Sequence, residues 1–421
     1  MINNQLSIML LHIEDFLRTN NAAGVFKLFQ APAILLCGKP LARIKTLIEI
    51  ATYYPRTSIG KLAISKANAL TKRYLSRLQQ VDNTEISRSA IIKPFVRERE
   101  PGFLLVSFEQ NLENILSLRS FTQFSAQYRI IFLPTWQPFY STAACLLAAR
   151  SQETFFIMPS AFSEEDICQE FTPLCHFLPF HAASWVHGDF YDTPCNTKTI
   201  DILMVANFSK YKRHWRLFEA LSDLPNTLRV TLAGIPWGGH TRGSLLEEAH
   251  LFGVDKQITI VEGASDQTIR DFLSRSKLFC GMSVKEGSYI AVAEALMAGT
   301  PVVMFRTAKI GTRAYINKET GFFLTKDRPL GPQLNEILQR CGSINPQAWA
   351  KRNISARANC KRLNTLLRHW SEDHGLGWSN GIEPFFSRHF EFEYMDPEAE
   401  ERLYPEYRRV KDQFGLSIRR N

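Results

Sequence analysis

Short apolar runs alternate with helical patterns through the second half of the chain. Each run is apolar at successive positions, which is typical of strands buried on both faces of a parallel sheet. The runs are IDILMVA (200–206), LRVTLAG (228–234), QITIVEG (257–263), KLFCGM (277–282) and PVVMF (301–305). Helices are expected between them near 212–222, 243–252, 266–275 and 288–299. The pattern predicts a doubly wound, Rossmann-like α/β domain whose ligand lies at the carboxyl ends of the strands.

The first half of the chain shows the same alternation less cleanly. Its candidate strands are PAILLC (32–37), GFLLVSF (102–108), YRIIFLP (128–134), TFFIMP (154–159) and CHFLPF (175–180). A helix is expected at 138–150, and the polar stretch 187–199 is typical of an interdomain linker. These elements predict a second α/β domain before the linker.

The length of 421 residues favours two domains, because a single hydrophobic core rarely grows that large. We expect an N-terminal domain over 1–186, the linker over 187–199 and a C-terminal domain over 200–370. The remaining tail, 371–421, is aromatic and charged and shows no clear strand.

The chain is basic, with a formal net charge of +9. This charge suits an anionic partner: nucleotide phosphates, acidic lipid headgroups or nucleic acid. Nucleic-acid binding would need a basic stripe with interleaved aromatic residues or a known motif, and the sequence shows neither. The eight cysteines are scattered, without CxxC or Cys/His zinc spacing, which favours reduced thiols in the cytoplasm.

The N-terminal stretch MINNQLSIMLLHIEDFLRTN has an apolar run of about eight residues. It lacks a basic start, and Glu14 and Asp15 follow at once, so we expect an amphipathic helix rather than a signal peptide. No run reaches the ~18 apolar residues of a membrane span.

Two glutamates mark the stretch VKEGSYIAVAEALMAGTPVVMF (284–305). Glu294 lies in an apolar helix that we expect to be buried, with no Lys or Arg three or four residues away. Its partner is therefore a cation from elsewhere in the fold or a ligand such as a sugar diol. Glu286 precedes Gly287 and Ser288 at the expected helix start, where free N–H groups make an anion site. The alternative is a helix-start acid and an ordinary ion pair of the core.

The segment EGSYIAVAEALMAGTPVV resembles the Glu-x7-Glu signature of retaining glycosyltransferase family 4, also called group 1. The resemblance extends over about 200–330 and implies GT-B architecture, two Rossmann-like domains facing across a cleft. It implies that Glu286 contacts hydroxyls of the donor sugar and that Glu294 holds the ribose diol. The phosphate-binding helix start falls on Gly287 and Ser288, and the bulk of Tyr289 would narrow the choice of sugar.

The segment LMVANFSKYKRHWRLFEAL (203–221) resembles the part of that family where one Arg and one Lys bracket the diphosphate. Lys212 falls on the Lys position, whereas Asn207 stands at the Arg position. Lys210 and Arg213 are close enough in sequence to compensate, although the cluster also fits a solvated helix start.

Gly234 falls on the family's glycine-containing turn beside the base. Trp237 after it could stack on the base or be a core aromatic. The first half lacks the family's Gly-rich loop, and Thr135–Gln137 occupies the place of its donor-contacting His. The resemblance also implies that the tail 371–421 packs back toward the first domain.

Metal-independent chemistry is expected, with no cofactor, because no DxD motif is present and the acidic stretch 164–167 has the pattern of a helical surface. The resemblance implies a retaining glycosyltransferase of polysaccharide biosynthesis. It would move a sugar from a UDP- or GDP-sugar to a hydroxyl of a glycan or lipid-linked acceptor. Lys212 and Glu286 would be the catalytic residues, with the diphosphate leaving group stabilised as a developing anion. The residues expected to bind the donor are Asn207, Arg213, Gly234, Gly287, Ser288, Tyr289 and Glu294.

An alternative is a catalytically degenerate nucleotide-sugar-binding partner of another transferase, motivated by Asn207 and the missing first-half features. In either case we expect a cytoplasmic protein with peripheral contact to an acidic membrane surface at the inner face of the membrane.

Overall fold

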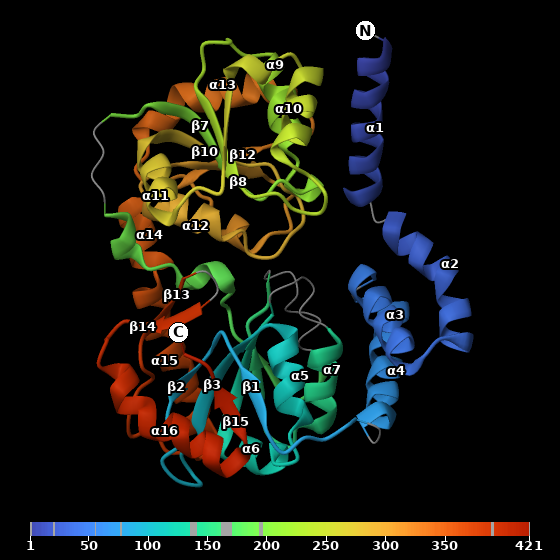
Figure 1. Ribbon diagram of the computed structural model, residues 1–421, viewed down its shortest axis with the longest axis vertical. Helices are drawn as coiled ribbons and strands as arrows, with labels where there is room; N and C mark the ends of the chain where they lie inside the picture. Colours follow the sequence, from blue (N-terminus) through green and yellow to red (C-terminus); the bar gives the residue numbers. More distant parts are fainter. Residues whose placement is uncertain are drawn as a thin grey trace. The chain divides into compact units, whose positions relative to one another are not determined.

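The computed structural model describes residues 2–19, 22–54, 56–75, 78–134, 141–160, 171–192, 197–388 and 391–420. The chain divides into two compact units (Figure 1). Unit 1 combines Met1–Thr19 with Val186–Ala358, and unit 2 combines Asn20–Trp185 with Asn359–Asn421. The first helix, α1 (Ile2–Thr19), therefore belongs with the second half of the chain.

Unit 1 is built on a six-stranded parallel sheet of order β12-β11-β10-β7-β8-β9. Its strands are β7 (Ile200–Val205), β8 (Val230–Gly234), β9 (Ile258–Glu262), β10 (Ser276–Gly281), β11 (Val302–Phe305) and β12 (Gly321–Leu324). The first five coincide with the five apolar runs of the sequence, so this part of the prediction is confirmed. The order reverses between β7 and β10, which makes the carboxyl ends of these two strands the place where a ligand is expected.

Helices cover both faces of this sheet. The helices are α9 (His214–Ser222), α10 (Arg242–Leu251), α11 (Asp266–Arg275), α12 (Ile290–Met297), α13 (Leu330–Arg340) and α14 (Gln347–Asn353). α9, α10 and α13 lie together on one face, and α11 and α12 lie on the other (Figure 1). The central strands β7, β10 and β11 are buried almost throughout, as their continuous apolar sequences require.

Unit 2 contains a five-stranded sheet of order β2-β3-β4-β5-β6, parallel except for the pair of β2 and β3. Its strands are β2 (Ser89–Lys93), β3 (Gly102–Ser107), β4 (Tyr128–Leu133), β5 (Phe155–Ile157) and β6 (Cys175–Phe177). Its described helices before residue 186 include α2 (Ala22–Cys37), α3 (Pro40–Tyr53), α4 (Ser58–Leu75), α5 (Glu109–Ser117), α6 (Phe121–Gln127) and α7 (Thr142–Arg150). One hydrophobic cluster joins the sheet to α3–α7, and a second joins its other face to the C-terminal segment.

Two predictions about secondary structure are wrong. Residues 32–37, predicted as a strand, form the last turns of α2. A run of six apolar residues cannot by itself distinguish a strand from a helix, and this one contains a single β-branched residue. The tail, in which no strand was predicted, contains the hairpin β13 (Phe385–Arg388) and β14 (Glu391–Tyr394) and the short β15 (Leu416–Ile418).

The C-terminal segment is tied to the rest of unit 2 by strand pairing and by side chains. β15 pairs in parallel with β1 (Thr84–Ile86). On α16 (Ala399–Phe414), Glu406 accepts hydrogen bonds from the backbone N–H of Phe95 and from the hydroxyl of Tyr128. The α15 helix (Ala356–Asp373) adds Leu363 and Leu367 to the second hydrophobic cluster.

A fully buried ion pair fastens this segment to β2. The ammonium of Lys93 lies 2.9 Å from Oε1 of Glu100, and both side chains have 0 % exposure. The same oxygen accepts hydrogen bonds from the backbone N–H and the hydroxyl of Ser379, at 2.6 and 2.7 Å. Burial alone would raise the pKa of Glu100, but the hydrogen bonds from Ser379 and Lys93 hold it down at about 2.

Replacing Glu100 by Ala should lower the free energy of unfolding by roughly 3–5 kcal/mol, because Lys93 is then buried without its counter-charge. Chemical denaturation at neutral pH measures this loss. The double variant Lys93→Met/Glu100→Leu should regain most of it, since both charges are gone. If Glu100→Ala were as stable as the wild type, the ion pair of Lys93 and Glu100 would not be stabilising the C-terminal segment.

The ion pair of Lys93 and Glu100 also predicts that the free energy of unfolding decreases at acidic pH. Because the folded-state pKa of Glu100 lies below its ordinary value of 4.5, its contribution is complete above that pH and is lost as the pH falls toward 2. Unfolding free energies measured across this window should fall more steeply for the wild type than for Glu100→Gln, and parallel curves would contradict the assignment.

Candidate active site

The site in unit 1 lies at the carboxyl ends of β7 and β10, where the strand order reverses. The loop after β7 carries Lys212 and the loop after β10 carries Glu286. Their side chains form an ion pair, and they are only 9 % and 10 % exposed. Neighbouring parallel strands thus bring together two charges that are 74 positions apart in the sequence.

Lys212 is held by aromatic rings as well as by Glu286. Its ammonium lies 3.8 Å from the ring centroid of Tyr289 and 5.4 Å from that of Tyr211. Attraction between a cation and the face of an aromatic ring adds to the Coulomb attraction of the carboxylate. Lys212 ends a short 3₁₀ turn, and Arg213, in a left-handed conformation with φ 60°, leads into α9. The backbone therefore fixes where the ammonium can reach.

The loop of Glu286 is fixed by a short parallel pairing with residues 309–311. The N–H of Lys309 donates to the carbonyl of Val284 at 2.7 Å, and the N–H of Gly311 donates to the carbonyl of Gly287 at 3.0 Å. Lys212 contacts Oε2 of Glu286. The other oxygen, Oε1, is buried and has no hydrogen-bond partner among the described residues.

Three further buried polar atoms near this loop also have no partner within the described parts of the chain. They are the hydroxyl groups of Ser283, Tyr289 and Thr312. Buried polar atoms are bonded in the great majority of cases, so such a group is a feature of a site that receives a polar ligand. Burial, and then the charge of Glu286, raises the pKa of Tyr289 well above its ordinary value, so its phenol remains a hydrogen-bond donor.

α12 begins later than the sequence suggested. Its first residue is Ile290, and Tyr289 before it adopts a left-handed conformation with φ 53°. Gly287 and Ser288 therefore lie in the loop that leads into the helix rather than in its first turn, and the side chain of Ser288 is buried. The left-handed residue turns the Tyr289 ring against Phe279, at a centroid distance of 5.9 Å.

Glu294 is half-buried, and the expectation of a fully buried carboxylate is wrong. Its carboxylate accepts a hydrogen bond from the hydroxyl of Tyr191, in the 3₁₀ turn Gly188–Tyr191. Burial, and then the negative charge of Glu294, raises the pKa of Tyr191. This contact could not be predicted from the helical pattern, because Tyr191 lies 103 positions away in the sequence.

Asn207 organises the loop after β7. Its Oδ1 accepts hydrogen bonds from the backbone N–H and the hydroxyl of Ser209, and its Nδ2 lies 3.3 Å from the hydroxyl of Tyr211. An Asn that bonds to the backbone two residues ahead is a common turn former. The residue at the position expected for an Arg thus shapes the turn that carries Lys212.

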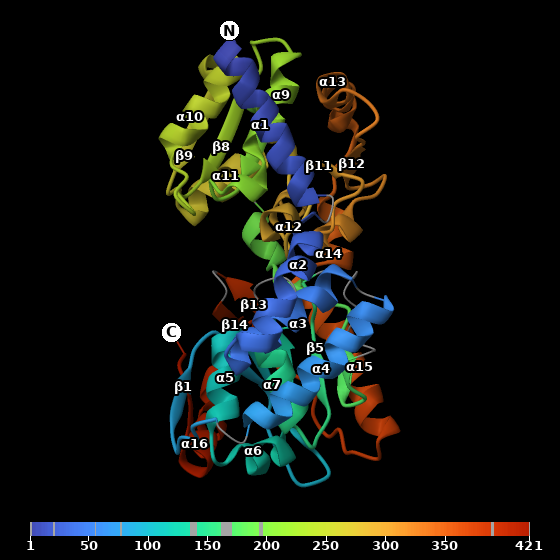
Figure 2. The same ribbon diagram turned by 90° about the vertical axis from the view of Figure 1, so that its right-hand side faces the viewer.

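Arg213 does not point to open solvent but joins β10 to the N-terminal helix. Its guanidinium donates to Asp15 at 2.6 Å and to the carbonyl of Met282 at 3.0 Å, and the side chain is 4 % exposed. Next to it, Lys210 pairs with Glu14 at 3.1 Å. Both cations proposed to compensate for Asn207 are thus paired with acids of α1, which runs alongside α10 (Figures 1 and 2).

Gly234 ends β8 beside the loop after β7. A Cβ at this position would lie 1.9 Å from the carbonyl oxygen of Ala206, so no other residue fits. A tight hairpin follows, in which Trp237 and His240 exchange backbone hydrogen bonds across Gly238 and Gly239. Both glycines have positive φ, and Trp237 is exposed rather than part of the core.

The comparisons with known proteins agree with this geometry. Residues 189–334 match the sequence profile of the family described as "Glycosyl transferases group 1". No curated protein sequence matches the chain. HepE from Anabaena, solved in complex with UDP, is similar in structure, with a TM-score of 0.50 at 15 % identity over 74 % of this chain and 84 % of that chain. The chain has the GT-B fold.

A second GT-B structure gives the same result. Sucrose-phosphate synthase from Thermosynechococcus elongatus aligns with a TM-score of 0.50 at 13 % identity, over 76 % of this chain and 81 % of that chain. The fold class predicted from the sequence is therefore confirmed. The profile match covers the loops of Lys212 and Glu286, so it falls on the part of the GT-B fold that forms the candidate site.

Two predictions lie outside the described residues: the segments 135–137 and 164–167. In the ranges that the structure does describe, no group of three or more His, Cys, Asp or Glu side chains could hold a metal ion. No helix in these ranges is long and apolar enough to cross a membrane.

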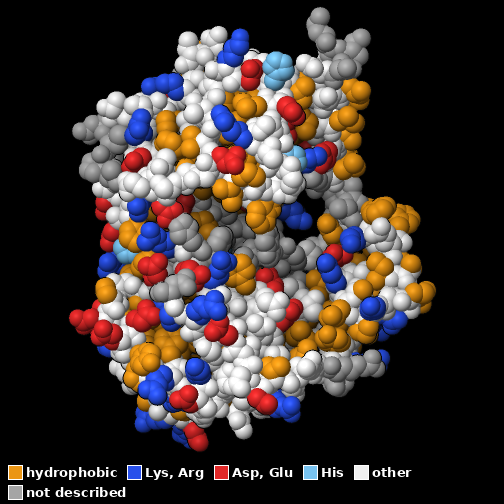
Figure 3. Space-filling view, in the orientation of Figure 1, with side chains coloured by type: hydrophobic (Ala, Val, Ile, Leu, Met, Phe, Trp, Pro, Cys, Tyr) orange, Lys and Arg blue, Asp and Glu red, His pale blue; other side chains and the backbone are white. Residues whose placement is uncertain are grey.

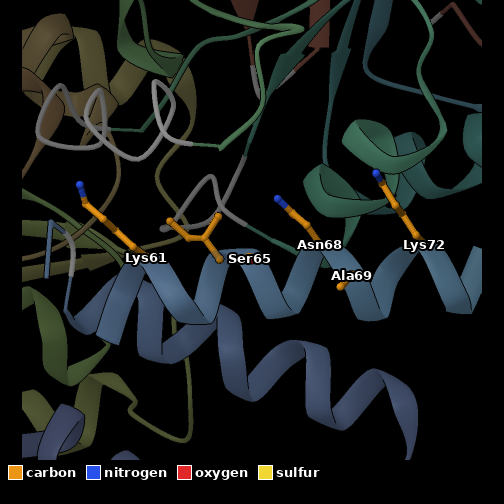
Figure 4. A pocket seen from close by; sticks show the side chains of 6 residues that line it. Lys61, Ser65, Asn68, Ala69 and Lys72 are labelled. Atoms are coloured by element: carbon orange, nitrogen blue, oxygen red, sulfur yellow. The ribbon is translucent and has the colours of Figure 1, made fainter. Parts of the chain in front are cut away.

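Unit 2 has a separate hollow of about 570 Å³ along α4 (Figure 4). Its described lining is Lys61, Ile64, Ser65, Asn68, Ala69 and Lys72. Lys61, Asn68 and Lys72 extend from the same side of the helix in this view. The hollow therefore carries two cations, Lys61 and Lys72, beside the apolar Ile64 and Ala69.

Two adjacent acids of α1 allow a matched test of its docking. Asp15→Ala should lower the free energy of unfolding of unit 1 by about 2–4 kcal/mol, because the Arg213 guanidinium loses its buried counter-charge. Glu14→Ala removes an exposed pair and should cost less than about 1 kcal/mol. Denaturant unfolding compares the two, and equal values would contradict the docking of α1 seen in this structure.

Proposed function

We propose that the protein is a retaining glycosyltransferase that moves a sugar from a UDP- or GDP-sugar to a hydroxyl group of a glycan or lipid-linked acceptor, without a metal. The observation that carries the proposal is the buried pair of Lys212 and Glu286 at the reversal of strand order. One Glu286 oxygen and the Tyr289 hydroxyl there lack partners among the described residues. A sugar supplies both donors and acceptors for such atoms.

Lys212 would stabilise the departing diphosphate. Negative charge grows on this group as the bond to the sugar breaks, and a fixed cation in a water-poor site is effective at that moment. The ammonium is positioned in advance by the carboxylate and by the Tyr289 ring. This cation, together with the amides before α12, is the basis for proposing that no metal is needed.

Glu286 would bind hydroxyl groups of the donor sugar through its Oε1, while Oε2 remains with Lys212. Glu294 would hold the ribose diol. A carboxylate has about four acceptor positions, so Glu294 can keep the Tyr191 hydroxyl and still accept from a diol. Retention of configuration rests on the resemblance of 286–303 to the Glu-x7-Glu signature. The uridine base is favoured because HepE was solved with UDP.

A cytoplasmic location is part of the proposal. All six cysteines in the described ranges are free thiols, which suits a reducing compartment.

The degenerate nucleotide-sugar binder remains the second candidate. It is favoured by Asn207 at the Arg position and by Arg213, whose guanidinium is engaged with Asp15. Such a protein would bind a nucleotide-sugar but release no nucleotide with any acceptor.

Release of UDP or GDP from a panel of nucleotide-sugars should be detectable for the wild type and should fall roughly 100-fold in kcat/KM for Lys212→Gln. Glutamine still donates a hydrogen bond to Glu286 but carries no charge. Lys326→Gln, at an exposed site far along the chain, is the control and should leave the rate unchanged. Donor binding without nucleotide release in the wild type would favour the second candidate.

Glu294→Ala should weaken the binding of UDP or GDP by roughly tenfold or more, because the ribose loses a charged hydrogen-bond acceptor. Tyr191→Phe should change the affinity little, since the carboxylate itself remains. Isothermal titration of both folded variants gives the comparison. An unchanged affinity of Glu294→Ala for UDP or GDP would contradict the proposed role of Glu294 in holding the ribose.

A further inference from the structure

The positive charge of the chain is concentrated in one short region. Residues 20–78 contain ten Lys and Arg but a single acid, Glu49. Their net charge of +9 equals that of the whole chain. Glu49 is already paired with Lys27, at 2.7 Å. Helices α2, α3 and α4 of unit 2 lie within this range, whereas the loops that hold Lys212 and Glu286 belong to unit 1.

The same helices expose large apolar side chains. Of the eighteen exposed large hydrophobic residues in the described parts of the chain, seven lie on α2, α3 and α4. They are Val25, Phe26, Phe29, Leu36, Leu41, Ile59 and Leu62. Phe29 is 81 % exposed and Leu36 is 76 % exposed. Figure 3 shows hydrophobic side chains, with Lys and Arg among them, over the side of unit 2 formed by α2–α4.

α2 is the outermost of the three helices. It packs on α3, which packs on α4, and α4 packs on α7 at the sheet. Ala31, Leu28 and Leu35 face this interior. Val25, Phe29 and Leu36 follow an i, i+4, i+11 spacing and form a stripe on another face. The helix AAGVFKLFQAPAILLC has one charged residue and is apolar nearly all round, which is unusual for a helix in water.

Each of the other two helices places a lysine beside its exposed apolar residues. On α3, Leu41 and the exposed Lys45 are four positions apart. On α4, Ile59, Leu62 and the exposed Lys66 follow an i, i+3, i+7 spacing. Residues at these spacings are neighbours on a helix surface. Such a surface offers apolar side chains for insertion and cations for anionic groups next to them.

We propose that α2–α4 dock the protein onto an anionic lipid surface. Apolar side chains would enter the boundary between headgroups and acyl chains, and the lysines would contact lipid phosphates. α2 would lie in the plane of the interface, since its 16 residues span only about 24 Å, less than the ~30 Å of a bilayer core. Lys61 and Lys72, which line the hollow along α4, belong to the same cationic set.

The positive charge of α2–α4 favours an anionic membrane, rather than a second copy of this chain, as the partner of this surface. Two copies meeting at this face would bring together two surfaces of the same sign, which opposes association. An anionic bilayer supplies both the apolar phase and the opposite charge. The inference goes beyond the proposed transferase activity and does not depend on it, because lipid binding can be measured without any donor or acceptor.

Sedimentation of the full chain with vesicles tests the proposal. The protein should bind vesicles of phosphatidylcholine that contain phosphatidylglycerol, bind pure phosphatidylcholine weakly, and dissociate at high salt. The triple variant Phe26→Ser/Phe29→Ser/Leu36→Ser should bind the anionic vesicles about tenfold more weakly or worse. Lys45→Glu/Lys66→Glu should show a loss of similar size.

The matched controls lie outside α2–α4. Tyr404→Ser removes another exposed apolar side chain, and Lys326→Glu reverses another exposed cation. Both should bind vesicles as the wild type does, and circular dichroism with thermal melting establishes that every variant is folded. Absence of binding to anionic vesicles would overturn the proposal. Self-association that the triple variant abolishes would also overturn the proposal. Binding to RNA that is tighter than binding to vesicles would overturn it as well.

Discussion

The ion pair between Lys212 and Glu286 is the constraint on which the candidate site depends. Two charges that are nine-tenths buried need each other, because either one alone would be costly to remove from water. The pair can form only because β7 and β10 are neighbours, so the strand order of unit 1 determines the chemistry at its edge. The two oxygens of Glu286 differ in their partners, and this difference matters for the site as much as the burial of the pair does. Oε2 of Glu286 contacts the Lys212 ammonium, whereas Oε1 lacks a partner among the described residues.

The N-terminal helix alters the charge around this pair. Asp15 and Glu14 pair with Arg213 and Lys210, the two cations in the loop after β7 that lie close enough in sequence to compensate for Asn207. The guanidinium of Arg213 then has a structural role, linking α1 to the carbonyl of Met282 at the end of β10. In the proposed function, a diphosphate would therefore be bound by Lys212 and by the backbone before α12 rather than by a cluster of cations.

The sequence predicted what is encoded locally. Strands buried on both faces are continuous apolar runs, so β7–β11 were visible without any tertiary information. Glu286 and Glu294 could be predicted as candidate site residues because they lie only eight positions apart in one segment. The contacts of Glu294 with Tyr191 and of Arg213 with Asp15 were missed, since each joins residues at least 100 positions apart. Residues 32–37 were mistaken for a strand because a short apolar run is compatible with either kind of element.

The net charge of the whole chain does not say where along the chain the excess positive charge lies. A value of +9 suits nucleotide phosphates, lipid headgroups and nucleic acid equally well. Outside residues 20–78, however, the chain has 40 Lys and Arg against 40 Asp and Glu. The excess charge therefore does not lie in the loops of unit 1 that carry Lys212 and Glu286. It describes α2–α4, and there it coincides with the exposed Phe29 and Leu36. Apolar surface and uniform positive charge on the same helices have one common complement, an anionic surface with an apolar interior.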